Sequence, residues 1–237
     1  MTSTDRSTEP AGSDRRPLLL FDMDGVLLEG RGTDSVVHER ALDDALAERG
    51  LDVDPETRSL LSGHEYDVDF VCGCRRLGVD PVELYGVRER HSARRVVDRI
   101  ESEDRTPYAD VDAIRALEER FTLGVVSNNY DEVVRFVTDH YGWDAFSYVR
   151  GRDPGVRGFH RRKPDPHYLL EAVETLDTDT GFYVGDRGTD LTAAARAGLE
   201  AVFVRRSHTT GEPLPFEPTL AVDSLRGLAT RLCPPPE

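Results

Sequence analysis

Four aspartates whose carboxylates could form a catalytic or metal-binding set stand in two pairs along the chain. Asp22 and Asp24 lie near the beginning of the sequence, and Asp186 and Asp190 lie far downstream. Carboxylates can act as nucleophiles, as general acids and bases, or as ligands of hard cations. If folding brings all four together, they cannot all stay ionised without a cation, and oxygen ligands of this charge suit magnesium.

A hydroxyl, an amide and an ammonium group lie between the two pairs. Ser127 and Asn128 follow an apolar run, and Lys163 opens the segment Lys-Pro-Asp-Pro. Lys163 is the only lysine among the 30 basic residues, since every other one is an arginine. We therefore expect a requirement at this position that the planar, wider guanidinium group cannot meet.

Most of these residues follow short apolar runs that are typical of buried parallel strands. Predicted strands near residues 17–21, 123–126, 146–149, 181–184 and 201–204 alternate with predicted helices near residues 111–120, 131–141, 166–176 and 191–197. This alternation predicts an α/β fold with a doubly wound parallel sheet and right-handed crossovers. Ligands bind such sheets at the carboxyl ends of the strands, where Asp22, Ser127 and Asp186 fall.

A long helical segment interrupts the alternation after the first strand. Apolar residues between Val37 and Leu46 recur on one helical face, and Asp54-Pro55 and Asp80-Pro81 each pair a capping aspartate with a proline at the first helical position. No strand is predicted in this segment. The sequence thus predicts a disordered leader at residues 1–16, an α/β core built from residues 17–34 and 106–237, and an all-helical cap at residues 35–105.

Four segments together resemble the motifs of the haloacid dehalogenase (HAD) superfamily. Residues 21–28 (FDMDGVLL) are similar to its first motif, residues 125–128 (VVSN) to its second, residues 163–166 (KPDP) to its third and residues 185–190 (GDRGTD) to its fourth. The helical insertion resembles the cap of the phosphoglycolate phosphatase and β-phosphoglucomutase-like branch. The resemblance covers about residues 17–204 and implies a Rossmann-like core with an inserted helical cap.

The resemblance also implies roles for the acidic residues. Asp22 would attack phosphorus and become an aspartyl phosphate, which splits one difficult displacement into two easier ones. Asp24 would protonate the leaving oxygen and later take a proton from the hydrolytic water. Mg²⁺ would be bound by Asp22, by the backbone carbonyl of Asp24 and by Asp186, and it would offset the repulsion between two anions.

The remaining motif residues would bind the phosphoryl group. By the same resemblance, Ser127 and the backbone amide of Asn128 would hold a phosphoryl oxygen, and Lys163 would neutralise charge on the nucleophile and the phosphoryl group. Asp190 would orient Lys163 or a metal-bound water. In the cap, His64, Tyr66 and Asp67 follow Gly63 at a turn where this branch tends to place substrate-facing side chains, although they could equally be ordinary loop and core residues.

The implied function is magnesium-dependent hydrolysis of a phosphomonoester, with a small phosphorylated metabolite as the substrate. Asp24 argues against a dehalogenase, because a halide leaving group needs no proton, and the absence of lysine from residues 1–162 argues against phosphonatase chemistry through a cap lysine. A phosphosugar mutase of the same superfamily remains an alternative. A phospho-receiver signalling domain is an alternative from another class, but receivers place the acceptor aspartate on the third strand and carry no helical lid.

Composition restricts the partners and the location. The 45 acidic residues against 30 basic ones give a net charge of −15, which disfavours binding to nucleic acid or to anionic membranes. The apolar runs are too short to span a membrane, and the polar N-terminus lacks a secretory signal, so we expect a cytoplasmic protein that is a monomer or a homodimer. Few lysines and many carboxylates indicate a halophilic protein of a salt-rich cytosol or a biased genomic composition. Three cysteines form neither a disulfide framework nor a zinc site.

Overall fold

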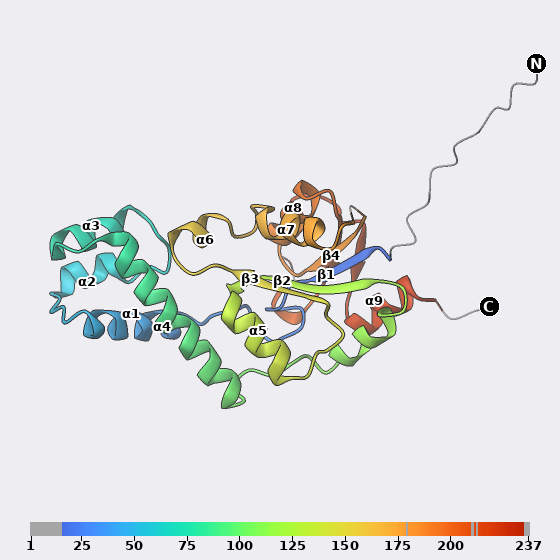
Figure 1. Cartoon of the computed structure of the whole chain (residues 1–237), viewed down its shortest axis with the longest axis horizontal. Helices are drawn as coiled ribbons and strands as arrows, with labels where there is room; N and C mark the ends of the chain where they lie inside the picture. The colour runs from blue at the N-terminus through green and yellow to red at the C-terminus, as the bar shows by residue number, and fades with distance from the viewer. Residues whose placement is uncertain (1–15, 179, 210, 212, 235–237) are drawn as a thin grey trace, which may run out of the picture.

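A parallel sheet forms the centre of the protein (Figure 1). The computed structural model describes residues 16–178, 180–209, 211 and 213–234. Within these residues the sheet has six strands in the order β3-β2-β1-β4-β5-β6, with every neighbouring pair parallel. The strands are β1 (Leu18–Phe21), β2 (Thr122–Tyr130), β3 (Tyr148–Arg152), β4 (Gly181–Gly185), β5 (Glu200–Val204) and β6 (Leu220–Val222). The strand order reverses at β1, so the carboxyl end of this strand lies at the switch point where such sheets bind ligands.

Helices cover both faces of the sheet, and β1 supplies side chains to both layers. Leu19 and Phe21 pack with α5 (Asp131–His140), with α9 (Leu225–Leu232) and with the 3₁₀ segment η1 (Val111–Leu117). Leu18 and Leu20 pack on the opposite face, with α7 (His167–Thr175) and α8 (Gly188–Arg196). Because both faces are covered, all four residues of β1 are buried, which explains why this strand is continuously apolar in the sequence.

The cap extends to one side of the core and has its own apolar cluster (Figure 1). Its helices are α1 (Ser35–Glu48), α2 (Pro55–Leu61), α3 (Val68–Leu77) and α4 (Pro81–Glu101). Each helix begins after an aspartate whose side chain accepts a hydrogen bond from a first-turn backbone amide, namely Asp34, Asp54, Asp67 and Asp80. These caps satisfy donors that helix formation leaves free, and they explain the predicted helix starts at Pro55 and Pro81.

The structure differs from the sequence prediction in several elements. The strand expected near residues 146–149 begins at Tyr148, and Phe146, which precedes it, packs into the core against Phe21. The helix expected at residues 111–120 is a 3₁₀ segment that ends at Leu117. Three short elements were not predicted: α6 (Val156–His160), β6 and α9.

The short helix α6 joins the core to the cap. It lies outside residues 35–105, yet Phe159 belongs to the apolar cluster of the cap, with its ring 5.8 Å from that of Tyr85. Lys163 follows only four residues after Phe159. The segment that carries the lysine is therefore packed against the cap.

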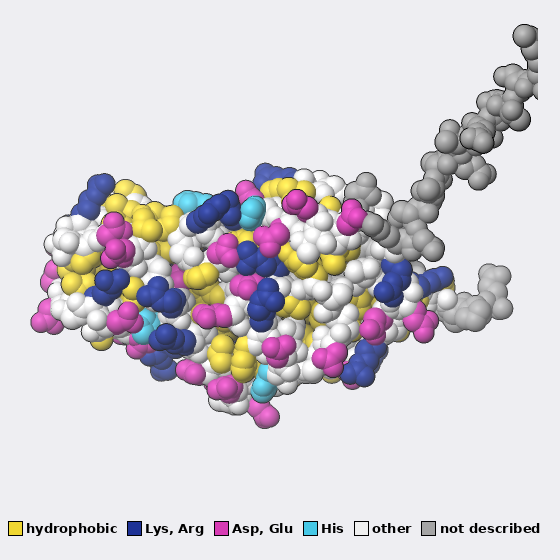
Figure 2. Space-filling view, in the orientation of Figure 1, with side chains coloured by type: hydrophobic (Ala, Val, Ile, Leu, Met, Phe, Trp, Pro, Cys, Tyr) yellow, Lys and Arg dark blue, Asp and Glu magenta, His cyan; other side chains and the backbone are white. Residues whose placement is uncertain are grey.

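The surface charges, the helix composition, the cysteines and the N-terminal segment can be compared with the remaining sequence predictions. On the face drawn in Figure 2, the described acidic and basic side chains are interspersed rather than gathered by sign. Within the described part of the chain, no helix combines the length and the apolar composition that a membrane span requires. All three cysteines lie in that part and are free thiols. The leader expected at residues 1–16 falls, except for Arg16, outside the described residues.

Candidate active site

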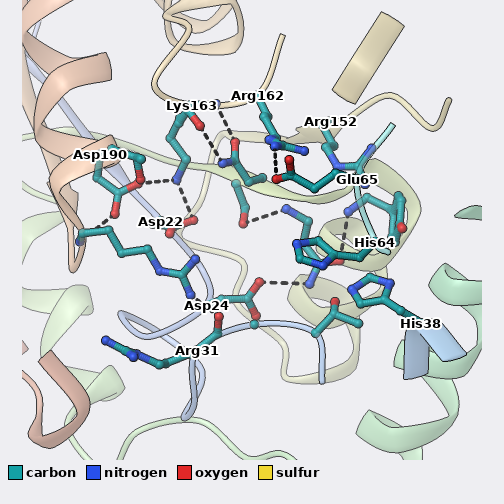
Figure 3. Close-up of a pocket in the computed structure, with 18 of the residues that line it drawn as sticks. Asp22, Asp24, Arg31, His38, His64, Glu65, Arg152, Arg162, Lys163 and Asp190 are labelled. Atoms are coloured by element: carbon teal, nitrogen blue, oxygen red, sulfur yellow. Dashed lines mark hydrogen bonds and ion pairs between the residues drawn. The ribbon is translucent and has the colours of Figure 1, made fainter. Parts of the chain in front are cut away.

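The predicted site residues meet at the carboxyl edge of the sheet. Asp22 follows β1, Ser127 lies in the last half of β2, and Asp186 follows β4. The loop before α7 brings Lys163 to the same edge, and Figure 3 shows its side chain beside Asp22 and Asp190. Six of the seven predicted residues are buried: Asp22, Asp24, Ser127, Lys163, Asp186 and Asp190. The folded chain thus assembles the set that the sequence predicts.

Lys163 makes three contacts through its ammonium group. Its Nζ lies 2.9 Å from Oδ1 of Asp22, 2.8 Å from Oδ1 of Asp190 and 2.5 Å from the hydroxyl oxygen of Tyr183. The Tyr183 hydroxyl donates to the carbonyl of Val126 at 2.7 Å, so its oxygen accepts from Lys163. Burial by itself lowers the pKa of Lys163, but the charges of Asp190 and Asp22 outweigh it and the pKa lies above its usual value. The ammonium is therefore a fixed positive charge beside Asp22.

Asn128 holds the backbone on which this lysine stands. Its side-chain Oδ1 accepts from the amide of Lys163 at 2.8 Å, and its Nδ2 donates to the carbonyl of Lys163 at 3.1 Å. The neighbouring Ser127 places its hydroxyl on the wall of the central cavity and accepts from the amide of Asn129 at 3.3 Å. The side chain of Asn128 thus has a structural task that the sequence did not predict.

Asp24 has two partners that sequence reasoning missed. Its Oδ2 accepts from Nδ2 of Asn129 at 3.0 Å, and its Oδ1 lies 2.8 Å from a guanidinium nitrogen of Arg105. Arg105 also donates to the carbonyl of Glu29. Asn129 could have been found because it adjoins the second motif. Arg105 gave no signal, since it lies 81 residues from Asp24 in the connection between α4 and the core.

Three carboxylates form a group that could hold a cation. Oxygens of Asp22, Asp186 and Asp190 lie within 4.8 Å of one another. Both oxygens of Asp190 already have partners: Oδ1 contacts Lys163, and Oδ2 accepts from the amides of Asp186 and Arg187. Asp190 therefore orients Lys163 and the loop after β4, which leaves Asp22 and Asp186 as the carboxylates of this group that could hold a cation.

The electrostatics of the two ligands fit a divalent cation. Burial raises the pKa of Asp22 to about 6, although Lys163 opposes the change. Burial, reinforced by the charges of Asp22 and Asp190, raises the pKa of Asp186 to about 8. Among the described residues, Oδ1 of Asp186 is a fully buried atom without a hydrogen-bond partner. A bound divalent cation would satisfy this oxygen and keep both carboxylates ionised.

One further side chain, not predicted from the sequence, touches this group. His208 places Nε2 2.7 Å from Oδ2 of Asp186. The histidine lies in the loop after β5, which also ends at the carboxyl edge of the sheet. Its position after a predicted strand is the signal that could have drawn attention to it.

The site opens into a cavity of about 420 Å³ between the core and the cap. The cap contributes His38, His64, Glu65 and Tyr85 to its wall. Of the three cap residues singled out from the sequence, only His64 lines the cavity. Tyr66 packs against the rings of Phe70 and Tyr85, and Asp67 caps α3 by accepting from the amide of Phe70.

Two ion pairs connect the cap with the core beside this cavity. Glu65 of the cap lies 2.8 Å from Arg162, and both side chains are labelled in Figure 3. Glu89 of α4 pairs at 2.6 Å with Arg152 at the end of β3, and both of these side chains are buried. The cap is therefore held against the segment that carries Lys163.

The comparison with known families agrees with this geometry. The model of the haloacid dehalogenase-like hydrolase family matches residues 17–198. The chain belongs to this family. It is also similar to Phosphoglycolate phosphatase 1 of Pseudomonas aeruginosa, with 26% identity over 243 residues that cover 94% of this chain and 82% of that protein.

Solved structures share the fold of this chain. CbbY from Rhodobacter sphaeroides in complex with phosphate has a TM-score of 0.63 at 21% identity, and the match covers 90% of this chain and 96% of that chain. A HAD-superfamily hydrolase of subfamily IA from Geobacter sulfurreducens has a TM-score of 0.51 at 20% identity, with coverage of 90% and 97%. The prediction of an α/β HAD core with an inserted helical cap is confirmed.

Proposed function

We propose that this chain is a magnesium-dependent phosphomonoester hydrolase that acts on a small phosphorylated metabolite through an aspartyl phosphate on Asp22. The observation that carries the proposal is the position of Asp22 at the wall of the cavity, paired with Lys163 and grouped with Asp186. A carboxylate in this setting has a cationic partner, a place for a metal and access to substrate. These are the requirements for covalent phosphoryl transfer to a carboxylate.

The proposed mechanism gives each acid a separate step. A carboxylate oxygen of Asp22 forms a bond to phosphorus as the bond from phosphorus to the leaving oxygen breaks. Asp24 gives its proton to that oxygen, and then takes a proton from the water that attacks the aspartyl phosphate. Asp22, the backbone carbonyl of Asp24 and Asp186 would hold Mg²⁺, which would offset the repulsion between the nucleophile and the phosphoryl group. Phosphate leaves, and both acids return to their starting states.

The remaining residues position the phosphoryl group. Lys163, held by Asp190 and Tyr183, keeps positive charge beside the nucleophile. The hydroxyl of Ser127 and the amide of Asn128 donate to a phosphoryl oxygen. Preorganised donors of this kind lower the barrier because they need not reorient as charge develops.

The substrate is proposed to be a small phosphate monoester that the cap, residues 35–105, encloses with the core. The cavity of about 420 Å³ is within the range of small-ligand sites. The name of the Pseudomonas aeruginosa relative makes 2-phosphoglycolate the first compound to test. Xylulose-1,5-bisphosphate, which is bound in another CbbY structure with a TM-score of 0.60, is the second.

The test is phosphate release from a panel of small phosphate monoesters with Mg²⁺, at low salt and at molar KCl. Wild type should release phosphate, and the Asp22→Asn variant should not, because an amide is a poor nucleophile. Asp112→Asn is the matched control, since Asp112 is an exposed aspartate of the core. Turnover by Asp22→Asn above a few per cent of the wild-type rate would show that the nucleophile is another residue.

The same assay separates the alternatives. A mutase would convert a sugar phosphate into its isomer without net phosphate release. A phospho-receiver would form a long-lived phosphoprotein. The chain belongs to a hydrolase family, which favours turnover over a stable phosphoprotein. Activity that rises at molar KCl would support a protein adapted to a salt-rich cytosol.

A further inference from the structure

Within the described part of the chain, the carboxylate of Asp186 has one oxygen in a hydrogen bond and one without a hydrogen-bond partner. The residue is fully buried, and its Oδ2 lies 2.7 Å from Nε2 of His208. Among the described residues, its Oδ1 has no hydrogen-bond partner, and the nearest cation, Nε of Arg187, is 3.9 Å from it. His208 therefore occupies Oδ2, and Oδ1 remains available to another ligand.

The imidazole of His208 is itself oriented from its other side. Its Nδ1 lies 3.4 Å from the hydroxyl of Tyr108. If the phenol donates to Nδ1, Nε2 carries the hydrogen and donates to Asp186. An ionised carboxylate can only accept, so when Asp186 is a metal ligand Nε2 carries the hydrogen and Nδ1 is the acceptor.

The turn that presents His208 is fixed by the residues around it. His208 is the central residue of the 3₁₀ turn η2 (Ser207–Thr209), which Thr209 closes by accepting from the amide of Arg206 at 3.0 Å. The guanidinium of Arg206 makes two contacts of 3.1 Å with Asp110 and lies 3.7 Å from the ring centre of Tyr108. It also donates to the carbonyl of Val26 at 2.9 Å. The turn is thereby tied to the loop that carries Asp22 and Asp24.

Gly25 of that loop packs directly on the pair of Asp186 and His208. Its φ is +83°, a conformation that favours glycine. A Cβ at this position would lie 2.2 Å from Oδ2 of Asp186 and 3.0 Å from Nε2 of His208. The loop therefore leaves no space into which the carboxylate could turn on this side.

We propose that His208 is a positioning residue for the metal ligand Asp186. It donates from Nε2 to Oδ2, so that the carboxylate is held in one orientation and Oδ1 is left for the cation. The inference rests on the proposed function, because it assumes that Asp22 and Asp186 hold Mg²⁺. Hydrogen bonds to ligating carboxylates fix their orientation, and removal of such partners typically lowers metal affinity about 10–100-fold.

The experiment measures binding of Mg²⁺ alone by isothermal titration calorimetry in the absence of substrate. His208→Ala should raise the Kd for Mg²⁺ about 10–100-fold. His208→Gln, whose amide can reach toward Asp186 as a donor, should retain much of the affinity. Tyr108→Phe should cause a smaller loss, because only the orientation of the ring is affected. His140→Ala, which removes an exposed histidine on α5, is the matched control and should bind as wild type does.

The outcomes separate this inference from the proposed function. If wild type binds no Mg²⁺, the metal site of the proposed function fails, and the role of His208 fails with it. If wild type binds but folded His208→Ala has a Kd within about twofold of it, the positioning role alone is overturned. An equal loss of Mg²⁺ affinity in the alanine and glutamine variants would also overturn it, because the glutamine amide retains a donor that should preserve much of the affinity. A loss far larger for Ni²⁺ than for Mg²⁺ would identify His208 as a direct ligand instead.

Discussion

Replacement of Lys163 by arginine tests whether the site needs only a positive charge or the compact shape of an ammonium. The three acceptors of Lys163, on Asp22, Asp190 and Tyr183, match the three hydrogens of its Nζ. A guanidinium is planar and larger, and its donors point outward in one plane. Because the side chain of Lys163 is only 3% exposed, the extra atoms have no room unless Asp22 or Asp190 moves.

The structure sets the size of the expected loss. At 2.9 Å and an effective dielectric constant of about 20, the attraction between Lys163 and Asp22 is at most about 6 kcal/mol. Only the part that differs between the ground state and the transition state affects the rate. Removal of one preorganised electrostatic contact typically costs about 10²–10³-fold, or about 2.7–4 kcal/mol. We expect Lys163→Arg to lose activity almost as severely as Lys163→Ala.

The assay is steady-state phosphate release at saturating Mg²⁺, after circular dichroism and thermal melting have shown that each variant is folded. Arg161→Lys, a charge-conserving exchange in the same loop, is the control and should behave as wild type does. A Lys163→Arg variant within about threefold of wild type would refute the shape argument and leave charge as the only requirement.

Further predictions concern the second acid, the metal and the contact between cap and core. Asp24→Asn should slow turnover about 10²–10⁴-fold and let the aspartyl phosphate accumulate, which acid-quench mass spectrometry would detect. Mg²⁺ should support turnover and Ca²⁺ should bind with little turnover; full activity after exhaustive chelation would contradict this. Because the pKa of Asp186 is raised to about 8, the folded metal-free protein keeps a proton that the unfolded chain loses, so it should lose stability as the pH rises from about 4 to about 8. Mg²⁺ needs the ionised carboxylate, so in thermal melts it should restore more stability at pH 8 than at pH 6. Glu89→Ala should lower the free energy of unfolding by about 3–5 kcal/mol, because it leaves the buried charge of Arg152 unpaired; a loss under about 1 kcal/mol in urea titrations would show that the pair is solvated.

The cap helices and the central strand were predictable because their signals are local. The side chains of Asp54 and Asp80 cap the helices that follow them, so the dipeptide with proline specifies a helix start without knowledge of the fold. The apolar run ending at Phe21 similarly indicates a strand covered on both faces. By contrast, β6 has three residues and α6 has five, which are too few for a periodic pattern.

The sequence by itself determined which motif residues meet. Asp22, Ser127, Lys163 and Asp186 adjoin strand ends or an adjacent loop, and the parallel topology brings strand ends to one edge whatever the details of packing. Their partners depended on tertiary structure. His208 contacts Asp186, Arg105 contacts Asp24, and the side chain of Asn128 contacts the backbone of Lys163. In each case the two segments are close in space although they are far apart in the sequence. Local propensity and periodicity predict the secondary structure of a segment from that segment alone. A hydrogen bond between distant segments depends on where tertiary packing places each of them.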